Sequence, residues 1–177
     1  MEVVTKTASI RFCCSVNHPL VKHTEYEITK LQSKRSLPVE LLLLADETWD
    51  AIKKYIYDSE VYLLKLKEWP QPIAVTALYK MSDDQIEIKN IAVLESLQGK
   101  GIGSYLMNEI KRIAMNNRYK SIIVGTPDTS STLIRFYEKN GFIKYAVRKN
   151  FFIKNYSNPI KENGVILRNM VMLKLDV

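Results

Sequence analysis

The chain has 177 residues, which is the length of one domain, and its 46% hydrophobic and 25% charged residues form an ordinary globular mixture. Its net charge of +7 favours anionic partners, but neither a run of like charges nor a basic–aromatic repeat indicates nucleic acid. The longest purely aliphatic run is Leu41–Leu44, too short for a membrane span, and we read no signal peptide. Adjacent Cys13 and Cys14, the only cysteines, are not expected to pair, so we expect a cytoplasmic protein.

Residues 1–23 are expected to be an N-terminal arm, either packed on the domain or disordered, and residues 24–177 the domain itself. Glu25–Leu31 alternates polar and apolar residues, which predicts a strand. From Pro38 to Ile56, apolar residues recur at three- and four-residue steps, which predicts one long helix with a buried face.

The rest of the chain predicts two more helices and six more strands. One helix covers Ser104–Met115, and another runs to Asn140, capped by Thr129, Ser130 or Ser131. The strands cover Val61–Leu66, Ile73–Tyr79, Gln85–Leu94, Ser121–Gly125, Phe142–Phe152 and Val165–Leu175. This order predicts an α/β domain with a mixed sheet, with hairpins in the middle and one strand–helix–strand crossover.

The glycine-rich turn Gln98–Gly103 joins a strand to a helix, an arrangement suited to binding phosphate. A main chain without Cβ atoms can approach a ligand closely, and the following helix directs N–H groups and its positive end at an anion. The nucleotide P-loop pattern fails because Lys100 lies between glycines, and the dinucleotide pattern fails because one residue separates Gly101 from Gly103. The remaining pattern, Gln/Arg-x-x-Gly-x-Gly/Ala, fits this turn.

Two segments resemble the Gcn5-related N-acetyltransferase family. Ile91–Leu106 (Ile-Ala-Val-Leu-Glu-Ser-Leu-Gln-Gly-Lys-Gly-Ile-Gly-Ser-Tyr-Leu) looks like the family's acetyl-coenzyme A signature, and Leu133–Phe142 (Leu-Ile-Arg-Phe-Tyr-Glu-Lys-Asn-Gly-Phe) is similar to its late helix and following turn. The resemblance covers the chain from about Tyr26 onward. It implies a single α/β domain with a mixed, mostly antiparallel sheet of six or seven strands, splayed at its centre and flanked by helices. The alternative is a plain strand–turn–helix with glycines for tight packing.

The resemblance implies acetyl-coenzyme A as the cosubstrate. Backbone N–H groups of the turn would receive its pyrophosphate, and main-chain groups of the preceding strand would pair with its pantetheine arm. Where relatives often carry an asparagine that contacts the cofactor, this chain has Ser130. The expected cofactor-binding residues are Ile91, Ala92, Val93, Gln98, Gly99, Lys100, Gly101, Ile102, Gly103, Ser104 and Ser130. Arg135 either faces the cofactor phosphates or is an exposed helical arginine.

Two residues are candidates for the chemistry of acetyl transfer. Glu87 lies where histone-type relatives carry a glutamate base, so it is a candidate general base, directly or through water. Its alternative is a solvent-facing strand glutamate. Tyr137 matches the tyrosine that lies near the coenzyme sulfur in many relatives, so it is a candidate acid toward the leaving thiolate. Its alternative is a core aromatic beside Phe136.

The acceptor predicted by this resemblance is a primary amine of a small molecule. A peptide or protein amine and a non-catalytic acetyl-coenzyme A-binding regulator are the alternatives. A polycationic acceptor would need acidic residues, and the available ones are Asp83, Asp84, Glu87, Asp128 and Glu162. No Cys/His cluster predicts a metal site, and His18 and His23 are given no role. Either a monomer or a homodimer is compatible with the sequence.

Overall fold

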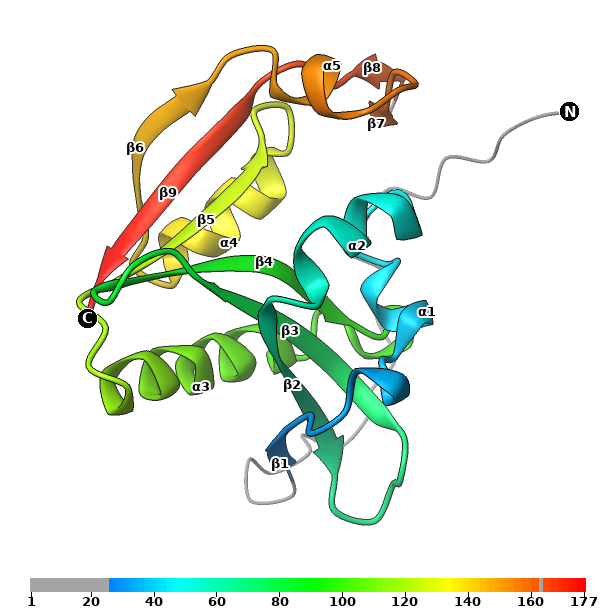
Figure 1. Ribbon diagram of the computed structural model, residues 1–177, viewed down its shortest axis with the longest axis vertical. Coiled ribbons are helices and arrows are strands. Elements are labelled where there is room, and N and C mark those ends of the chain that lie inside the picture. The colour runs from blue at the N-terminus through cyan, green and yellow to red at the C-terminus, as the bar shows by residue number, and fades with distance from the viewer. Residues whose placement is uncertain (1–25, 163) are drawn as a thin grey trace, which may run out of the picture.

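The fold is built on one seven-stranded sheet. The computed structural model describes residues 26–162 and 164–177, so the predicted arm, residues 1–23, lies outside the described residues. Within this part the sheet order is β1-β2-β3-β4-β5-β9-β6, and its neighbours are antiparallel except for β4 and β5, which are parallel (Figure 1). The strands are β1 Tyr26–Lys30, β2 Ser59–Leu66, β3 Pro72–Lys80, β4 Gln85–Val93, β5 Ser121–Pro127, β6 Ile143–Arg148 and β9 Met170–Asp176. The predicted mixed, mostly antiparallel sheet is therefore confirmed.

Helices cover both faces of this sheet (Figure 1). Apolar residues of α3 (Ile102–Asn116) and α4 (Ser131–Lys139) pack in the larger core cluster, whereas α1 (Val39–Leu42) and α2 (Trp49–Ile56) pack in a second cluster. A third, smaller cluster joins α5 (Phe151–Asn155) to the segment around a small hairpin of β7 (Lys161–Glu162) and β8 (Val165–Ile166). None of the helices in the described part of the chain is long and apolar enough to cross a membrane.

Strand β4 separates from β5 halfway along its length. The parallel pairing runs only from Gln85 opposite Ser121 to Ile88 opposite Val124, although both strands continue. Directly after this point the register with β3 shifts, so that Lys89 has no partner residue there, as in a β-bulge. A bulge of this kind bends a strand, and among the described strands none pairs with the β5-facing edge of the second half of β4.

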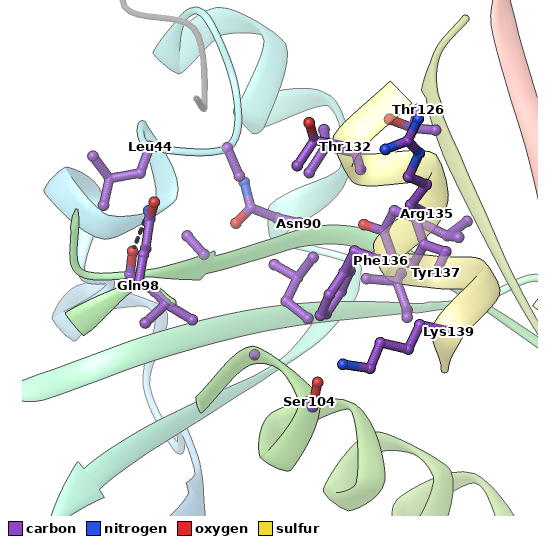
Figure 2. Close-up of a pocket in the computed structure, with 18 of the residues that line it drawn as sticks. Leu44, Asn90, Gln98, Ser104, Thr126, Thr132, Arg135, Phe136, Tyr137 and Lys139 are labelled. Carbon is purple, nitrogen blue, oxygen red and sulfur yellow. Dashed lines mark hydrogen bonds between the residues drawn. The ribbon is translucent and has the colours of Figure 1, made fainter. Parts of the chain in front are cut away.

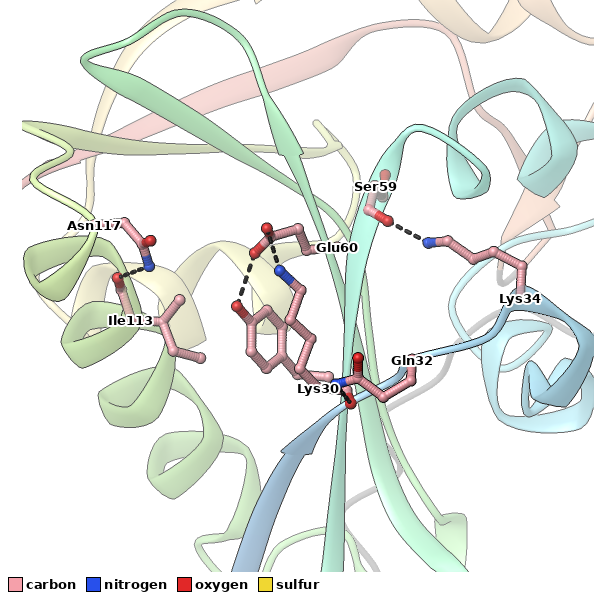
Figure 3. A network of polar contacts seen from close by, with 8 residues as sticks. Lys30, Gln32, Lys34, Ser59, Glu60, Ile113 and Asn117 are labelled. Atoms are coloured by element: carbon pink, nitrogen blue, oxygen red, sulfur yellow. Dashed lines mark hydrogen bonds and ion pairs between the residues drawn. The ribbon is translucent and has the colours of Figure 1, made fainter.

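Figure 3 shows a polar network that attaches β1 and the following segment to β2. The Lys30 ammonium lies 2.5 Å from a Glu60 carboxylate oxygen, and the Tyr62 hydroxyl donates to the other oxygen at 2.8 Å. Lys34 donates to the carbonyl oxygens of Ile56 and Ser59. Because these groups are partly exposed, the network contributes little energy and mainly fixes the path of the chain.

Three predicted elements were wrong in extent. The expected helix from Pro38 to Ile56 is two helices, because the Thr48 hydroxyl accepts a hydrogen bond from the Ala51 N–H and starts α2. The predicted strand to Phe152 ends at Arg148, because Phe152 is buried in α5 against Ile160 and Leu167. Likewise, the predicted strand Val165–Leu175 is divided between β8 and β9.

Candidate active site

The glycine-rich turn has a backbone geometry suited to binding an anion at the start of α3. Gly99 and Gly101 have φ angles of +75° and +83°, which L side chains rarely adopt, and Gly101 is the N-terminal cap residue of α3. A Cβ on Gly103 would lie 3.3 Å from the Phe136 ring, so the glycine lets α3 approach α4 closely. Backbone N–H groups in the first turn of a helix have no intrahelical partner, so here they are available to an anion.

The free edge of β4 leads directly to this turn. The Leu94 N–H donates to the Ile73 carbonyl of β3 at 2.9 Å. Because main-chain groups alternate in direction along a strand, those of Ile91 and Val93 point to the opposite, open side. The Gln98 side-chain amide donates a hydrogen bond to the Val93 carbonyl oxygen at 3.0 Å (Figure 2). The open edge therefore offers the main-chain groups of Ile91 and the N–H of Val93 to a ligand.

A cavity of about 750 Å³ fills the space between the separated strands, within the usual size of a small-molecule site. Most of the predicted cofactor-binding residues line it, and these are Ile91, Ala92, Val93, Gln98, Gly99, Gly101, Gly103 and Ser104. Lys100, Ile102 and Ser130 do not line it. Ile102 is buried in the main core with Leu106, and the Ser130 hydroxyl donates a hydrogen bond to Glu162.

Two cations on α4 face this cavity. Arg135 and Lys139 both line it, one helical turn apart, and Figure 2 shows the Lys139 side chain extending toward Ser104 in the first turn of α3. Neither forms an ion pair with a residue in the described ranges. Of the two alternatives for Arg135, the position in the cavity wall favours the one that faces the cofactor, and Lys139 was not predicted, although the four-residue spacing places both on one helical face. Both add positive potential beside the anion-binding turn.

Tyr137 lies in the wall of the cavity and is only 5% exposed. Its ring makes edge-on contacts with Phe136 and Phe142, with ring centroids 5.3 Å and 5.6 Å away. Burial raises the pKa of the Tyr137 phenol well above its usual value of 10. The phenol therefore stays protonated and can donate a hydrogen bond to a group in the cavity.

Glu87 is buried beside the cavity, not in its wall. Glu87 is 4% exposed and does not line the cavity, and its carboxylate lies 2.8 Å from the Lys89 ammonium. The solvent-facing alternative for Glu87 is therefore wrong. Lys89 lines the cavity and also approaches the ring of Tyr79, with the ammonium 5.6 Å from the ring centroid. Any proton transfer between Glu87 and a ligand needs an intermediary.

A second cavity, of about 140 Å³, adjoins the first. Its walls share several residues with the larger cavity: Ala45, Lys89, Gly125, Pro127 and Leu133. Carboxylates of Asp46, Glu47 and Glu162 line it, together with the aromatic side chains of Phe152 and Tyr156. The loop between α1 and α2 thus brings two acidic residues to a site that the β7 segment completes.

Hydrogen bonds fix two of these carboxylates. The hydroxyls of Tyr55 and Tyr156 each donate to an oxygen of Asp46 at 3.2 Å, and the Ser130 hydroxyl donates to Glu162 at 2.5 Å. Ser130 occupies the N-terminal cap position of α4, but its side chain makes no capping hydrogen bond, contrary to the predicted capping role. Burial raises the pKa of Asp46, and burial with the neighbouring Asp46 and Glu162 charges raises the pKa of Glu47.

Asn90 is a buried amide in the middle of β4 that the sequence analysis missed. It is 2% exposed, lines the larger cavity, and donates to the Leu42 carbonyl at 2.9 Å and the Tyr55 hydroxyl at 3.1 Å. Its side-chain carbonyl oxygen has no hydrogen-bond partner among the described residues. Figure 2 shows the amide reaching from β4 toward the segment that carries Leu44. The available signal was that Asn90 interrupts the alternation of polar and apolar residues that runs from Gln85 to Lys89.

Other predicted acidic candidates lie elsewhere. Asp83 and Asp84 form surface ion pairs with Lys80 and Lys120, and neither they nor Asp128 line either cavity. Of the five acidic residues named from the sequence, only Glu162 lines a cavity. In the described ranges, no group of three or more His, Cys, Asp or Glu residues is arranged to hold a metal ion.

Comparison with known proteins agrees with this geometry. Residues 26–142 match the Acetyltransferase (GNAT) family. YvbK of Bacillus subtilis (strain 168), an uncharacterized N-acetyltransferase, is 36% identical over 78% of this chain and 88% of its own length. A GNAT family acetyltransferase from Elizabethkingia anophelis, solved with acetyl-CoA bound, is 36% identical, with a TM-score of 0.81 over 86% of this chain and 99% of that one. A Bacillus subtilis acetyltransferase in complex with CoA is 34% identical, with a TM-score of 0.77 over the same shares. The chain therefore belongs to the GNAT family of acetyltransferases.

Proposed function

We propose that this chain transfers the acetyl group of acetyl-coenzyme A directly to a primary amine of a small molecule. The observation that carries the proposal is the open edge of β4, which leads through one continuous cavity from the glycine-rich turn to Tyr137. Relatives that are more than 30% identical are solved with acetyl-CoA or CoA bound, which supports the same cosubstrate here.

The residues of the larger cavity fit the parts of acetyl-coenzyme A. The pyrophosphate binds the N–H groups of Gly99, Gly101, Gly103 and Ser104, with Arg135 and Lys139 supplying positive charge. The pantetheine arm pairs with the main chain of Ile91 and the N–H of Val93, because these groups face the gap between β4 and β5. Lys100, Ile102 and Ser130 are left out of the proposed cofactor contacts because they do not line the cavity.

The chemistry needs a neutral amine and a stabilised leaving group. Tyr137 donates a hydrogen bond to the departing coenzyme sulfur, since its phenol stays protonated within the cavity wall. Glu87 remains the proposed general base, acting through water because its carboxylate is screened from the cavity and paired with Lys89. The smaller cavity, which adjoins the thioester end, holds the acceptor.

A free-thiol assay over an amine panel tests this proposal. The panel contains alkylamines, diamines, amino acids, aminoglycosides and short peptides, each with acetyl-coenzyme A. Thiol release with one or more small amines, and none with peptides, supports the proposal. Turnover that is restricted to peptides indicates the peptide or protein alternative. Tight acetyl-coenzyme A binding without thiol release from any amine identifies a non-catalytic regulator.

A further inference from the structure

The smaller cavity is strongly acidic inside a basic protein. Among the described residues, its walls carry the carboxylates of Asp46, Glu47 and Glu162 and a single cationic side chain, that of Lys89. Lys89 is already paired with Glu87 at 2.8 Å, and the chain as a whole has a net charge of +7. Such a local excess of negative charge against the sign of the whole molecule favours a cationic ligand at this position.

Hydrogen bonds hold two of these carboxylates in place although like charges repel one another. Asp46 accepts hydrogen bonds from the hydroxyls of Tyr55 and Tyr156. Glu162, which is 8% exposed, accepts a hydrogen bond from the Ser130 hydroxyl. Lys54 approaches from outside, where its ammonium donates to the Asn155 carbonyl and lies 6.0 Å from the Tyr156 ring centroid. Burial and the neighbouring charges of Asp46 and Glu162 raise the pKa of Glu47, as expected where like charges lie close together.

Asn90, in the wall of the larger cavity, is an independent sign of a ligand. Its side-chain carbonyl oxygen is buried without a hydrogen-bond partner among the described residues, which leaves it able to accept from an N–H donor. Its amide group donates to Tyr55, which in turn donates to Asp46, so one hydrogen-bonded chain links the larger cavity to the acidic one. A neutral amine is a donor that suits this oxygen.

We propose that the acceptor is a short diamine, whose reacting amine lies at Asn90 and whose second, charged ammonium lies in the acidic cavity. This inference rests on the proposed acetyltransferase function. Since a water molecule occupies about 30 Å³, the 140 Å³ of the acidic cavity holds about five non-hydrogen atoms. That room fits an ammonium on a short alkyl chain.

Matched acceptors test the charge requirement directly. We compare kcat/KM for 1,4-diaminobutane, 1-aminobutane, 4-amino-1-butanol and 4-aminobutanoate, which share a four-carbon chain. The diamine should be preferred over 1-aminobutane by at least about tenfold, which corresponds to about 1.4 kcal/mol. The amino alcohol should resemble 1-aminobutane, and the anionic 4-aminobutanoate should be the poorest. Equal values for the diamine and 1-aminobutane, or a preference for 4-aminobutanoate, would overturn the inference and leave the acetyltransferase function intact.

Variants assign the preference to the acidic cavity. In Glu162→Gln the ratio of kcat/KM for the diamine to that for 1-aminobutane should fall by about tenfold. Asp84→Asn is the matched control, because Asp84 pairs with Lys120 at the surface and lines neither cavity, and it should keep the ratio. A ratio that is unchanged in Glu162→Gln contradicts the inference.

Calorimetry separates the inference from the function on which it rests. Titration of 1,4-diaminobutane into the protein with coenzyme A bound should show binding that Glu162→Gln weakens. If the diamine binds in this way but no amine releases thiol, the catalytic proposal fails while the cationic site stands. If the diamine neither binds nor is acetylated while another small amine releases thiol, the inference fails and the acetyltransferase function stands. If no amine of the panel releases thiol either, both fail.

Discussion

At the scale of single residues, Tyr137 is the side chain whose environment points most clearly to chemistry. It is buried between Phe136 and Phe142, yet its surface lines the cofactor cavity. The Tyr137→Phe variant removes only the hydroxyl and keeps the ring contacts. We expect kcat to fall by about ten- to a hundredfold, with the KM for acetyl-coenzyme A changed by less than about twofold. Steady-state kinetics measures both, and Tyr145→Phe, on exposed β6, is the control. An unchanged kcat contradicts the acid role of Tyr137.

Asp46 predicts a pH dependence of stability. Because burial raises its pKa above the usual value of 3.8, the folded protein retains this proton at a pH where the unfolded chain has lost it. The contribution of Asp46 to the free energy of unfolding is therefore greatest below the unfolded pKa and is lost as the pH rises through the folded pKa. Relative to the wild type, Asp46→Asn should gain stability as the pH is raised from about 4 to about 7.

Urea denaturation across this pH range checks the sign. The exposed Asp50 serves as the comparison, since a hydrogen bond from Lys53 lowers its pKa. The difference between Asp50→Asn and the wild type should therefore change with pH in the opposite direction. If the difference between Asp46→Asn and the wild type is constant with pH, the pKa of Asp46 is not raised in the folded protein.

At the scale of elements, the turn before α3 combines a backbone constraint with a ligand contact. In Gly101→Ala the φ angle of +83° becomes unfavourable, although no atom lies within 4 Å of the new Cβ. We expect a loss of about 1–2 kcal/mol in the free energy of unfolding and a higher KM for acetyl-coenzyme A. Gly164→Ala is the matched control, because Gly164 has a φ of +81° and equally open space, outside the cofactor cavity. It should lose stability without a change in KM.

The elements also show how far sequence reasoning reaches. The cofactor half was predictable because its signals are local: Gln98, Gly101 and Gly103 have a spacing that the backbone of one turn requires. The acceptor half was not, because Asp46 and Glu162 are far apart in the sequence and meet only through the packing of α5 and the small hairpin. The apolar periodicity around Asp46 also favoured one continuous helix, and the capping hydrogen bond of Thr48 overrode it.

At the scale of the whole molecule, the ligand cavity lies where the sheet has the fewest paired residues. Between β4 and β5 only four residue pairs, from Gln85–Ser121 to Ile88–Val124, connect the two parts of the sheet. Acetyl-coenzyme A would add contacts between these two parts, from β4 to α4. At a ligand concentration 100 times its Kd, binding should raise the free energy of unfolding by about 2.7 kcal/mol.

Thermal denaturation with coenzyme A, and with 3′-dephospho-coenzyme A for comparison, measures this effect. The midpoint should rise with the logarithm of ligand concentration for both compounds, and the concentration needed should reflect their affinities. Amide hydrogen exchange should slow in β4 after Ile88 and in the first turn of α3. Protection confined to the distant β1–β2 edge would place the ligand elsewhere.

The separation of β4 from β5 has a consequence for the order of events in turnover. The smaller cavity, which we propose as the amine site, shares wall residues with the larger cavity, among them Ala45, Lys89 and Leu133. The cosubstrate therefore forms part of the surface that the amine meets, and its arrival completes the acceptor site. Turnover should follow a compulsory sequence, with acetyl-coenzyme A first on and coenzyme A last off. In product-inhibition kinetics, coenzyme A would then compete with acetyl-coenzyme A and not with the amine.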